Sequence, residues 1–199
     1  LDPGDKLVGV AITDGTRDVM LCTSGGKAIR FLEDDVRPMG RTAYGVWGID
    51  LEEADAVVSL EVVRQGGTVL TVCSNGFGKR TPIIEYTRHS RATRGMIAIT
   101  TSERNGKVVA ATLVRNDDEV MLITTGGVLI RTRVAEIREM GRATQGVTLI
   151  ALDGGTRLSG LQRVVERDSD VVNGDNGHAT AVDTGSTDDN GSADEPPQN

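Results

Sequence analysis

The sequence has few of the residues from which membrane spans, disulfide scaffolds and aromatic cores are built. Among its 199 residues, aromatic side chains make up 3%, and there are two cysteines and two histidines. No run approaches the roughly 20 apolar residues that cross a bilayer, and no basic and apolar leader precedes the first candidate strand. These absences exclude a membrane span and a secretory signal. Since the sequence begins at Leu1, we expect it to be a piece of a longer protein.

Glycine is abundant and charge is unevenly distributed. There are 25 glycines, and the formal net charge is -7. From Asp168 onward the chain has eight acidic residues and no Lys or Arg, whereas residues 1–167 have 22 basic and 21 acidic residues. The segment 168–199 is also rich in Gly, Ser, Asn and Thr, which bury little apolar area. We therefore predict a near-neutral body, residues 1–167, followed by a disordered acidic tail, residues 168–199.

An internal repeat dominates the body. Residues 18–51 align without a gap on residues 119–152, with 16 of 34 positions identical. A third copy lies halfway between them, so the period is 50 to 51 residues and the repeats span about 18–63, 68–115 and 119–165. Repetition at such a period is typical of propellers and solenoids.

Each repeat is predicted to form four short strands. In the first repeat these are residues 19–23, 28–32, 46–51 and 56–63, with a glycine turn between the first two. We also expect a lone strand at residues 7–13 and a closing strand at residues 157–165. Short β-branched runs separated by Gly-Gly and Asn-Gly turns favour antiparallel hairpins. Four-stranded units repeated radially predict an all-β, propeller-like fold, and three of them form an open fragment.

The residues that could carry out chemistry are few. If one residue is dropped near the turn of the middle repeat, Cys22 and Cys73 fall at the same position of successive repeats, and Ile123 falls there in the third. This pattern indicates a packing position rather than a disulfide or a metal site, and it favours a reduced, cytoplasmic protein. The two histidines are His89 and His178, and His178 lies in the predicted tail, so no catalytic constellation and no metal site are predicted.

Basic residues recur at equivalent positions of the repeats. A radial repeat places such residues along one rim, and a basic rim suits contact with phosphates of any sequence. The alternative is that they are solvated charges that protect exposed strand edges. The candidate DNA-binding residues are Arg30, Arg37, Arg41, Lys79, Arg80, Arg88, Arg91, Arg94, Arg131, Arg138 and Arg142.

Several sequence runs resemble a known family. The runs DEVMLITTGGVLIRTRVAEI, MGRATQGVTLI, SNGFGKRT and SRATRGMIAITTSERNGKVV, with GLQRV before an acidic tail, resemble the C-terminal domain of the bacterial DNA gyrase A subunit. The resemblance covers roughly residues 1–167. It implies a β-pinwheel, a propeller-like fold in which neighbouring blades exchange strands. It also implies a domain that binds and wraps double-stranded DNA on a basic perimeter and so supports ATP-dependent negative supercoiling.

The sequence departs from that family in two respects. The signature heptapeptide Gln-Arg-Arg-Gly-Gly-Lys-Gly is absent, and so is the catalytic tyrosine with its breakage-reunion core. The sequence therefore looks like the last three blades with the tail. The resemblance implies the rest of the gyrase A chain and the gyrase B chain as partners in an A2B2 assembly, with no membrane partner. ATP and Mg would be used on other domains, and no cofactor is expected in this fragment.

Three alternatives remain at this point. The topoisomerase IV protein that corresponds to gyrase A has a related C-terminal domain, and the closing repeat with its acidic tail favours gyrase over it. Kelch propellers have repeats of similar length and act in protein interaction, but their blades carry more aromatic residues. An enzyme on a propeller scaffold would need recurrent acid–base groups, which this sequence lacks.

Overall fold

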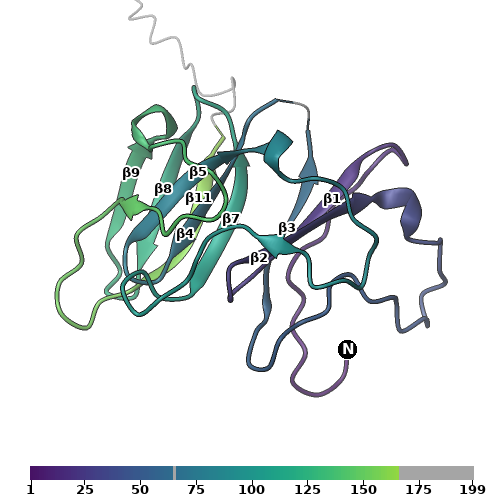
Figure 1. Ribbon diagram of the computed structural model, residues 1–199. Helices are drawn as coiled ribbons and strands as arrows, with labels where there is room; N and C mark the ends of the chain where they lie inside the picture. Colours follow the sequence, from purple (N-terminus) through teal and green to yellow (C-terminus); the bar gives the residue numbers. More distant parts are fainter. Residues whose placement is uncertain (65, 166–199) are drawn as a thin grey trace, which may run out of the picture. The chain divides into compact units, whose positions relative to one another are not determined.

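Short antiparallel strands joined by glycine turns make up most of the computed structural model, which describes residues 1–64 and 66–165 (Figure 1). The predicted disordered tail, residues 168–199, lies outside the described residues. The strands of the first repeat are β1 (Asp18–Thr23), β2 (Lys27–Leu32) and β3 (Val57–Val63). Those of the second are β4 (Thr68–Cys73), β5 (Phe77–Pro82), β6 (Met96–Ile97) and β7 (Val108–Val114). Those of the third are β8 (Glu119–Thr124), β9 (Leu129–Arg133), β10 (Val147–Thr148) and β11 (Leu158–Val164).

A 3-10 turn follows the second strand of each repeat. These turns are η1 (Glu33–Asp35), η2 (Ile83–Glu85) and η3 (Val134–Glu136). Each turn leads into a loop of ten residues that ends at a glycine with positive φ, namely Gly45, Gly95 or Gly146. We call these three segments the outer loops: residues 36–45, 86–95 and 137–146.

Neighbouring repeats exchange strands. The three sheets have the strand orders β3-β1-β2-β6, β10-β5-β4-β7 and β11-β8-β9. The fourth strand of the first sheet thus comes from the second repeat, and that of the second sheet comes from the third repeat. All pairings are antiparallel. The prediction of an all-β, propeller-like arrangement of antiparallel sheets that stays open is confirmed, with a third sheet of three described strands.

The exchanged strands require glycine on the donor side. In the first sheet Lys27 pairs with Ile97 and Ala28 with Met96. A Cβ on Gly95, which has a φ of +65°, would lie 2.3 Å from the Ala28 carbonyl oxygen. Only glycine allows two backbones to approach this closely in a left-handed conformation. We call this contact between the first two repeats the first joint, and its counterpart around Gly146 the second joint.

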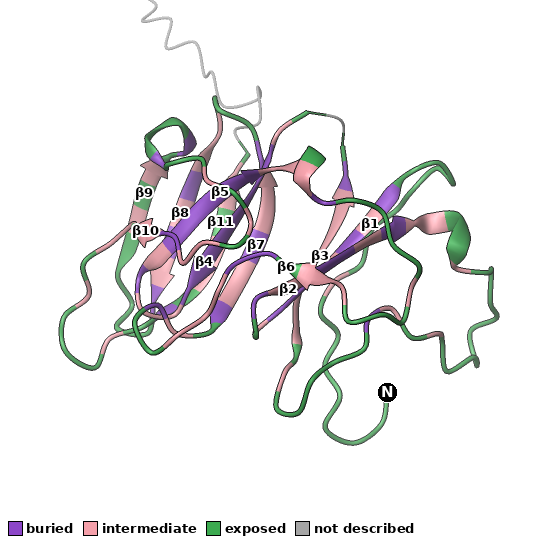
Figure 2. Cartoon of the chain, in the orientation of Figure 1, coloured by how far each residue is buried: buried purple, intermediate pink, exposed green. Residues whose placement is uncertain are grey.

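The core fills the two joints. One cluster includes Met20 and Cys22 of β1 and Val69 of β4, and a second includes Leu70 of β4 and Leu122 of β8. Strand β4 is consequently buried on both faces at every residue, whereas β8 alternates between buried and half-buried positions (Figure 2). The sequences do not reveal this difference, because β1 (DVMLCT) and β8 (EVMLIT) have apolar runs at least as long as that of β4 (TVLTVC). The burial of β4 follows from its place between the two core clusters.

Two predicted strands are absent. Residues 46–51 and residues 7–13 form no strand, although the predicted closing strand is present as β11. The segments equivalent to 46–51 in the other repeats, β6 and β10, pair only with the repeat that precedes them. The prediction was wrong because it assigned all four strands to a single repeat, whereas a strand needs a partner to satisfy its backbone groups.

Both cysteines are packing residues, as predicted, but they are not at equivalent positions. The strand register makes Cys22 the equivalent of Val72, and Cys73 the equivalent of Thr23. Cys22 and Cys73 are both buried and both are free thiols. Burial raises the pKa of each thiol to about 12, so both remain protonated and unreactive at neutral pH. In the described part of the chain, no helix has the length and apolar character needed to cross a bilayer.

Candidate nucleic-acid interface

The recurrent arginine at the centre of the second strand belongs to the joints. The guanidinium of Arg30 forms an ion pair with Asp18 at 2.6 Å and donates to the carbonyl oxygens of Ile83 and Tyr86 in the next repeat, at 3.2 and 3.1 Å. In the second joint Arg80 donates to the Ile137 carbonyl oxygen at 2.7 Å, and its side chain is buried. These two arginines hold the following 3-10 turn in place, which makes them poor candidates for contact with a ligand.

The recurrent arginine of the outer loops donates hydrogen bonds to the preceding repeat, whereas Arg30 and Arg80 donate to the following one. Arg91 donates to the carbonyl oxygens of Asp35 and Trp47 in the preceding repeat, at 2.9 and 2.8 Å. Arg142 does the same to Ile97 at 3.0 Å. Each joint therefore contains one arginine from each side, both bonded to backbone carbonyls. The repeated joint accounts for the recurrence of arginine at these positions, and the sequence pattern alone does not reveal it.

Lys79 is buried rather than displayed on the rim. Its side chain is 0% exposed, and its ammonium donates to the carbonyl oxygens of Gly141 and Arg142. Burial lowers the pKa of this ammonium to about 8, against the opposing attraction of Glu85. Phosphate cannot reach such a group without opening the second joint, so we remove Lys79 from the candidate interface.

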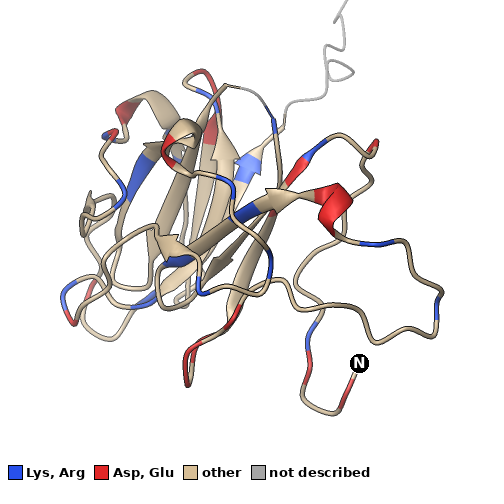
Figure 3. Ribbon diagram, turned by 45° about the vertical axis from the view of Figure 1, so that its right-hand side comes forward, with Lys and Arg blue, Asp and Glu red and all other residues tan. Residues whose placement is uncertain are grey.

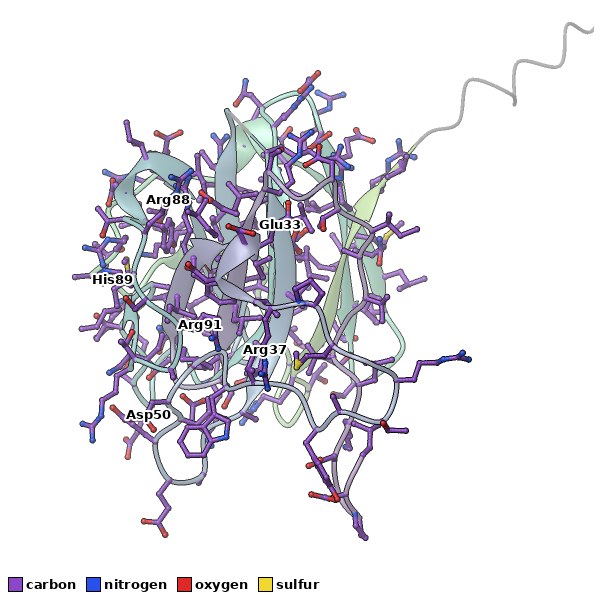
Figure 4. All side chains as sticks on the ribbon, turned by 90° about the vertical axis from the view of Figure 1, so that its right-hand side faces the viewer. Glu33, Arg37, Asp50, Arg88, His89 and Arg91 are labelled. Carbon is purple, nitrogen blue, oxygen red and sulfur yellow. The ribbon has the colours of Figure 1, made fainter. Side chains whose placement is uncertain are left out.

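Two arginines of the second outer loop are exposed but have acidic partners. Arg88 lies 3.0 Å from the carboxylate of Asp18, with 58% of its side chain exposed. Arg94 lies 3.6 Å from that of Asp50, with 73% of its side chain exposed. Figure 4 shows Arg37, Arg88 and Arg91 on the same side of the chain, with Glu33 among them. Pairs as exposed as that of Arg94 are weak in water, so this guanidinium remains available to another anion.

The remaining candidates are exposed. Arg37, Arg41 and Arg138 have no ion pair among the described residues, and all three lie in outer loops. Arg131 on β9 forms an ion pair with Glu119. Along the ribbon in Figure 3, positions of Lys and Arg are interspersed with positions of Asp and Glu.

Three further basic side chains, which the repeat pattern did not single out, lie at the ends of the strands opposite to the outer loops. Arg104, Lys107 and Arg157 are exposed in the turns that precede β7 and β11. Arg104 lies over the ring of Phe77, with 4.7 Å between the guanidinium carbon and the ring centroid. These residues do not recur in all three repeats, so the repeat pattern gave no signal for them. We call them the turn cations.

The described residues contain no group of three or more His, Cys, Asp and Glu side chains placed to hold a metal ion. An apolar groove is lined by Val10, Val19, Phe31 and Val46 among others, and Arg37 and Arg91 also line it. It lies on the face of the first sheet that points away from the second repeat. Nothing in it resembles an acid–base or nucleophilic constellation.

Comparison with known proteins settles the family. The family model described as "DNA gyrase C-terminal domain, beta-propeller" matches residues 17–64, 68–115 and 118–164, which together are most of the chain. The chain belongs to the DNA gyrase C-terminal domain family. This membership decides against the kelch alternative, and the three matched ranges coincide with the three repeats.

Several gyrase A proteins are similar in sequence to this gyrase-family chain. The DNA gyrase A protein of Salmonella typhimurium is 53% identical over 166 residues, which are 83% of this chain and 19% of that protein. The corresponding protein of Pseudomonas aeruginosa is 48% identical over 166 residues, covering 83% of this chain and 18% of that protein. The chain thus spans about a fifth of the length of these relatives.

Two solved structures share the fold. A DNA gyrase A C-terminal domain aligns with a TM-score of 0.71 and 28% identity, covering 75% of this chain and 51% of that one. The C-terminal domain of a DNA topoisomerase IV aligns with a TM-score of 0.78 and 25% identity, covering 82% of this chain and 51% of that one. The fold alone does not separate the two enzymes, whereas the sequence identities to gyrase A proteins favour gyrase.

Proposed function

We propose that this chain binds double-stranded DNA through the outer loops and wraps it along successive repeats. The observation that carries the proposal is the composition of these loops in a member of the gyrase C-terminal domain family. Together the three loops contain seven arginines and one acidic residue, Glu139. Because equivalent loops follow one another at the repeat period, a duplex that contacts one loop can meet the next.

The contacts are assigned to the outer-loop arginines that donate no hydrogen bond to a backbone carbonyl of a neighbouring repeat among the described residues. In chain order these are Arg37, Arg41, Arg88, Arg94 and Arg138, all of them exposed. Guanidinium groups on exposed loops bind phosphate oxygens without regard to base sequence, so the binding is sequence-tolerant and falls steeply with salt. Arg30, Arg80 and Lys79 contribute indirectly, by fixing the spacing between loops.

The wrapped DNA serves a larger assembly in this proposal. The chain would act beside the remainder of a gyrase A protein, with gyrase B proteins, in an A2B2 complex that carries out ATP-dependent negative supercoiling. ATP and Mg would bind to those other domains. The basis is membership of the gyrase family together with sequence identity to gyrase A proteins.

A variant with one change in each outer loop tests the proposal. The triple variant Arg37→Ala, Arg94→Ala, Arg138→Ala removes three exposed charges, of which Arg94 alone has an acidic partner among the described residues, the exposed Asp50. Affinity for duplexes of unrelated sequence should fall alike for each, and the slope of log K against log salt should flatten by about 0.9 for each lost phosphate contact. Electrophoretic mobility shifts over a salt series measure both quantities.

The matched control removes the same charge elsewhere. The turn cations are replaced in the variant Arg104→Ala, Lys107→Ala, Arg157→Ala, which should retain most of the affinity and the original slope. Equal losses in the two triple variants would show that net charge alone attracts the duplex, which contradicts an interface on the outer loops. No duplex binding by the natural chain at low salt would overturn the proposed function itself.

A further inference from the structure

The arginine at the centre of the second strand has a carboxylate partner in two of the three repeats. Arg30 forms an ion pair at 2.6 Å with Asp18, the first residue of β1. Arg131 forms an ion pair with Glu119, the first residue of β8. In both repeats, therefore, an acidic residue at the start of the hairpin balances the charge of this guanidinium.

The second repeat has the arginine without the carboxylate. Thr68 begins β4 and has the same place in the strand register as Asp18 in β1. Arg80 is 8% exposed and donates to neutral oxygens of Ile137 and Asn116. It forms no ion pair within the described part of the chain. A buried charge without a counter-charge is costly, so an anion beside Arg80 would stabilise the second joint.

A cleft with a volume of about 630 Å³ adjoins this arginine, where the second repeat connects to the third. Arg80 and Thr68 line it, together with Arg115 and Asn116, which follow the end of β7. Arg115 is exposed, and it too forms no ion pair with a described acidic residue. The residues that line the cleft thus include two arginines without an acidic partner.

The same residues carry hydrogen-bond donors that the rest of the described chain does not use. The hydroxyl oxygen of Thr68 is buried and has no hydrogen-bond partner among the described residues. The guanidinium of Arg115 and the side-chain amide nitrogen of Asn116 likewise have no partner there. An oxyanion accepts several hydrogen bonds at once, and its bonds to guanidinium groups are among the strong ones. The donor set around the cleft therefore suits an oxyanion.

Of the described residues that line the cleft, one is acidic. Glu139 is exposed and forms no ion pair among the described residues. It occupies the outer-loop position of Arg88, which in the first joint lies 3.0 Å from the Asp18 carboxylate. Its carboxylate repels an anion in the cleft, but water and salt screen the charge of an exposed side chain. Glu139 therefore weakens an anion site without closing it.

We propose that the cleft of the second joint binds an oxyanion of the phosphate type, held by Arg80, Arg115 and the Thr68 hydroxyl. The anion takes the part that the carboxylates of Asp18 and Glu119 play in the other two repeats. Inorganic phosphate and a phosphodiester group share the chemistry that this site recognises. The inference concerns the second joint and is independent of the proposed DNA binding by the outer loops, so its tests contain no DNA.

The first test is calorimetric titration of the whole 199-residue chain with sodium phosphate, at an ionic strength held constant with sodium chloride. The natural chain should show one saturable site. Arg115→Gln removes a charged donor and should weaken the affinity about tenfold or more. Arg64→Gln is the matched control, because Arg64 is the exposed equivalent of Arg115 in the first repeat and does not line the cleft. Absence of saturable binding, or equal weakening in the two variants, would overturn the site.

The second test supplies the counter-charge from the chain itself. Thr68→Asp places a carboxylate where the first repeat has Asp18, so it should abolish phosphate binding and raise the midpoint of urea denaturation in phosphate-free buffer. Thr68→Asn has the same shape without the charge and should still bind phosphate. Phosphate binding by Thr68→Asp with the natural affinity would show that the anion does not sit beside Arg80.

The third test removes the opposing charge and compares two anions. Glu139→Gln should tighten phosphate binding about two- to fivefold, whereas Glu136→Gln, at an exposed position that does not line the cleft, should leave it unchanged. Equal effects of the two changes would contradict the location. Dimethyl phosphate, a phosphodiester, is titrated in parallel. Binding of both anions supports a site that also accepts a nucleic-acid backbone, binding of inorganic phosphate alone supports a free oxyanion as the ligand, and binding of neither refutes the proposal.

Discussion

The first and second joints have the same backbone geometry and different chemistry. In the first, Arg30 has the carboxylate of Asp18 as its counter-charge, and the residue before it, Ile29, is buried and apolar. In the second, Arg80 is bonded to the neutral groups of Ile137 and Asn116. In the second joint the position of Ile29 is occupied by Lys79, whose ammonium group is buried.

The comparison shows that the fold requires an arginine in each joint but tolerates different charges around it. Both joints need a guanidinium that can donate to several carbonyl oxygens at once, which the planar five-donor group of arginine supplies. Neither requires a fixed arrangement of charge. The first joint neutralises its arginine with a carboxylate, whereas the second holds two cations with carbonyl and amide dipoles. The two joints should therefore respond differently to loss of a single charge and to pH.

The largest effect is expected from Asp18→Ala. Asp18 is buried and pairs with both Arg30 and Arg88, so its loss leaves the Arg30 guanidinium without a counter-charge. Breaking a buried pair on one side costs about 3–5 kcal/mol of unfolding free energy. Urea denaturation measures this loss. Asp50→Ala is the control, because its pair with Arg94 is exposed and should contribute less than about 1 kcal/mol.

An intermediate effect is expected from Lys79, and it depends on pH. Because burial lowers its pKa from 10.5 to about 8, the unfolded chain holds this proton more tightly than the folded protein between those two pH values. Lys79 therefore contributes a free energy of unfolding that rises with pH across that window, and above pH 9 the two buried thiols contribute in the opposite direction. The contribution is no more than about 3 kcal/mol at 1.36 kcal/mol per pKa unit.

Paired variants isolate the contribution of Lys79. Lys79→Met should lack this rising contribution, so its stability should differ from that of the natural chain by an amount that changes with pH. Lys107→Met, a change of the same type at an exposed position, should follow the natural chain. Urea denaturation at intervals from about pH 7.5 to about pH 10.5 gives the comparison. If Lys79→Met follows the natural chain at every pH, the ammonium is not buried in the second joint.

The smallest effect is expected from the cysteines, one in each of the first two repeats. Replacement of Cys22 or Cys73 by Val keeps an apolar side chain of similar size and should cost less than about 1.5 kcal/mol. Because burial raises both thiol pKa values from 9.0 to about 12, each thiol makes stability fall as pH rises between those limits. Each valine variant should lose its share of that fall in alkaline denaturation, and a larger loss at neutral pH would contradict simple packing.

Much of the fold was predictable because it is local and repeated. The hairpins and the three repeats follow from turn glycines and from comparing equivalent positions. The burial of Cys22 and Cys73 was predicted correctly from an alignment that the strand register does not support. Comparison of equivalent positions would have placed Lys79 correctly, since Ile29 and Ile130 occupy its position in the other repeats. Its charge suggested a surface residue, while its equivalents indicated an inward-facing one.

The remaining errors arose where one repeat depends on another. Residues 46–51 have strand character, but a strand forms only where a partner edge exists, and periodicity within one repeat does not reveal that edge. The arginines recur because the joint recurs, and sequence alone does not separate such a cause from recurrence along a binding surface. The exposed arginines of the outer loops became distinguishable only once carbonyl partners were known for the others.

Strand exchange also sets the order in which the sheets can form. Lys27 pairs with Ile97, and Phe77 pairs with Thr148. In each of the first two sheets the fourth strand is therefore synthesised well after the other three. Contacts of such long sequence separation slow folding, because loop-closure entropy must be overcome first. Once formed, they couple neighbours strongly: opening one repeat removes a strand from the sheet before it. The repeats should therefore unfold as a linked series, with stability that depends on the contacts between neighbours more than on any repeat alone.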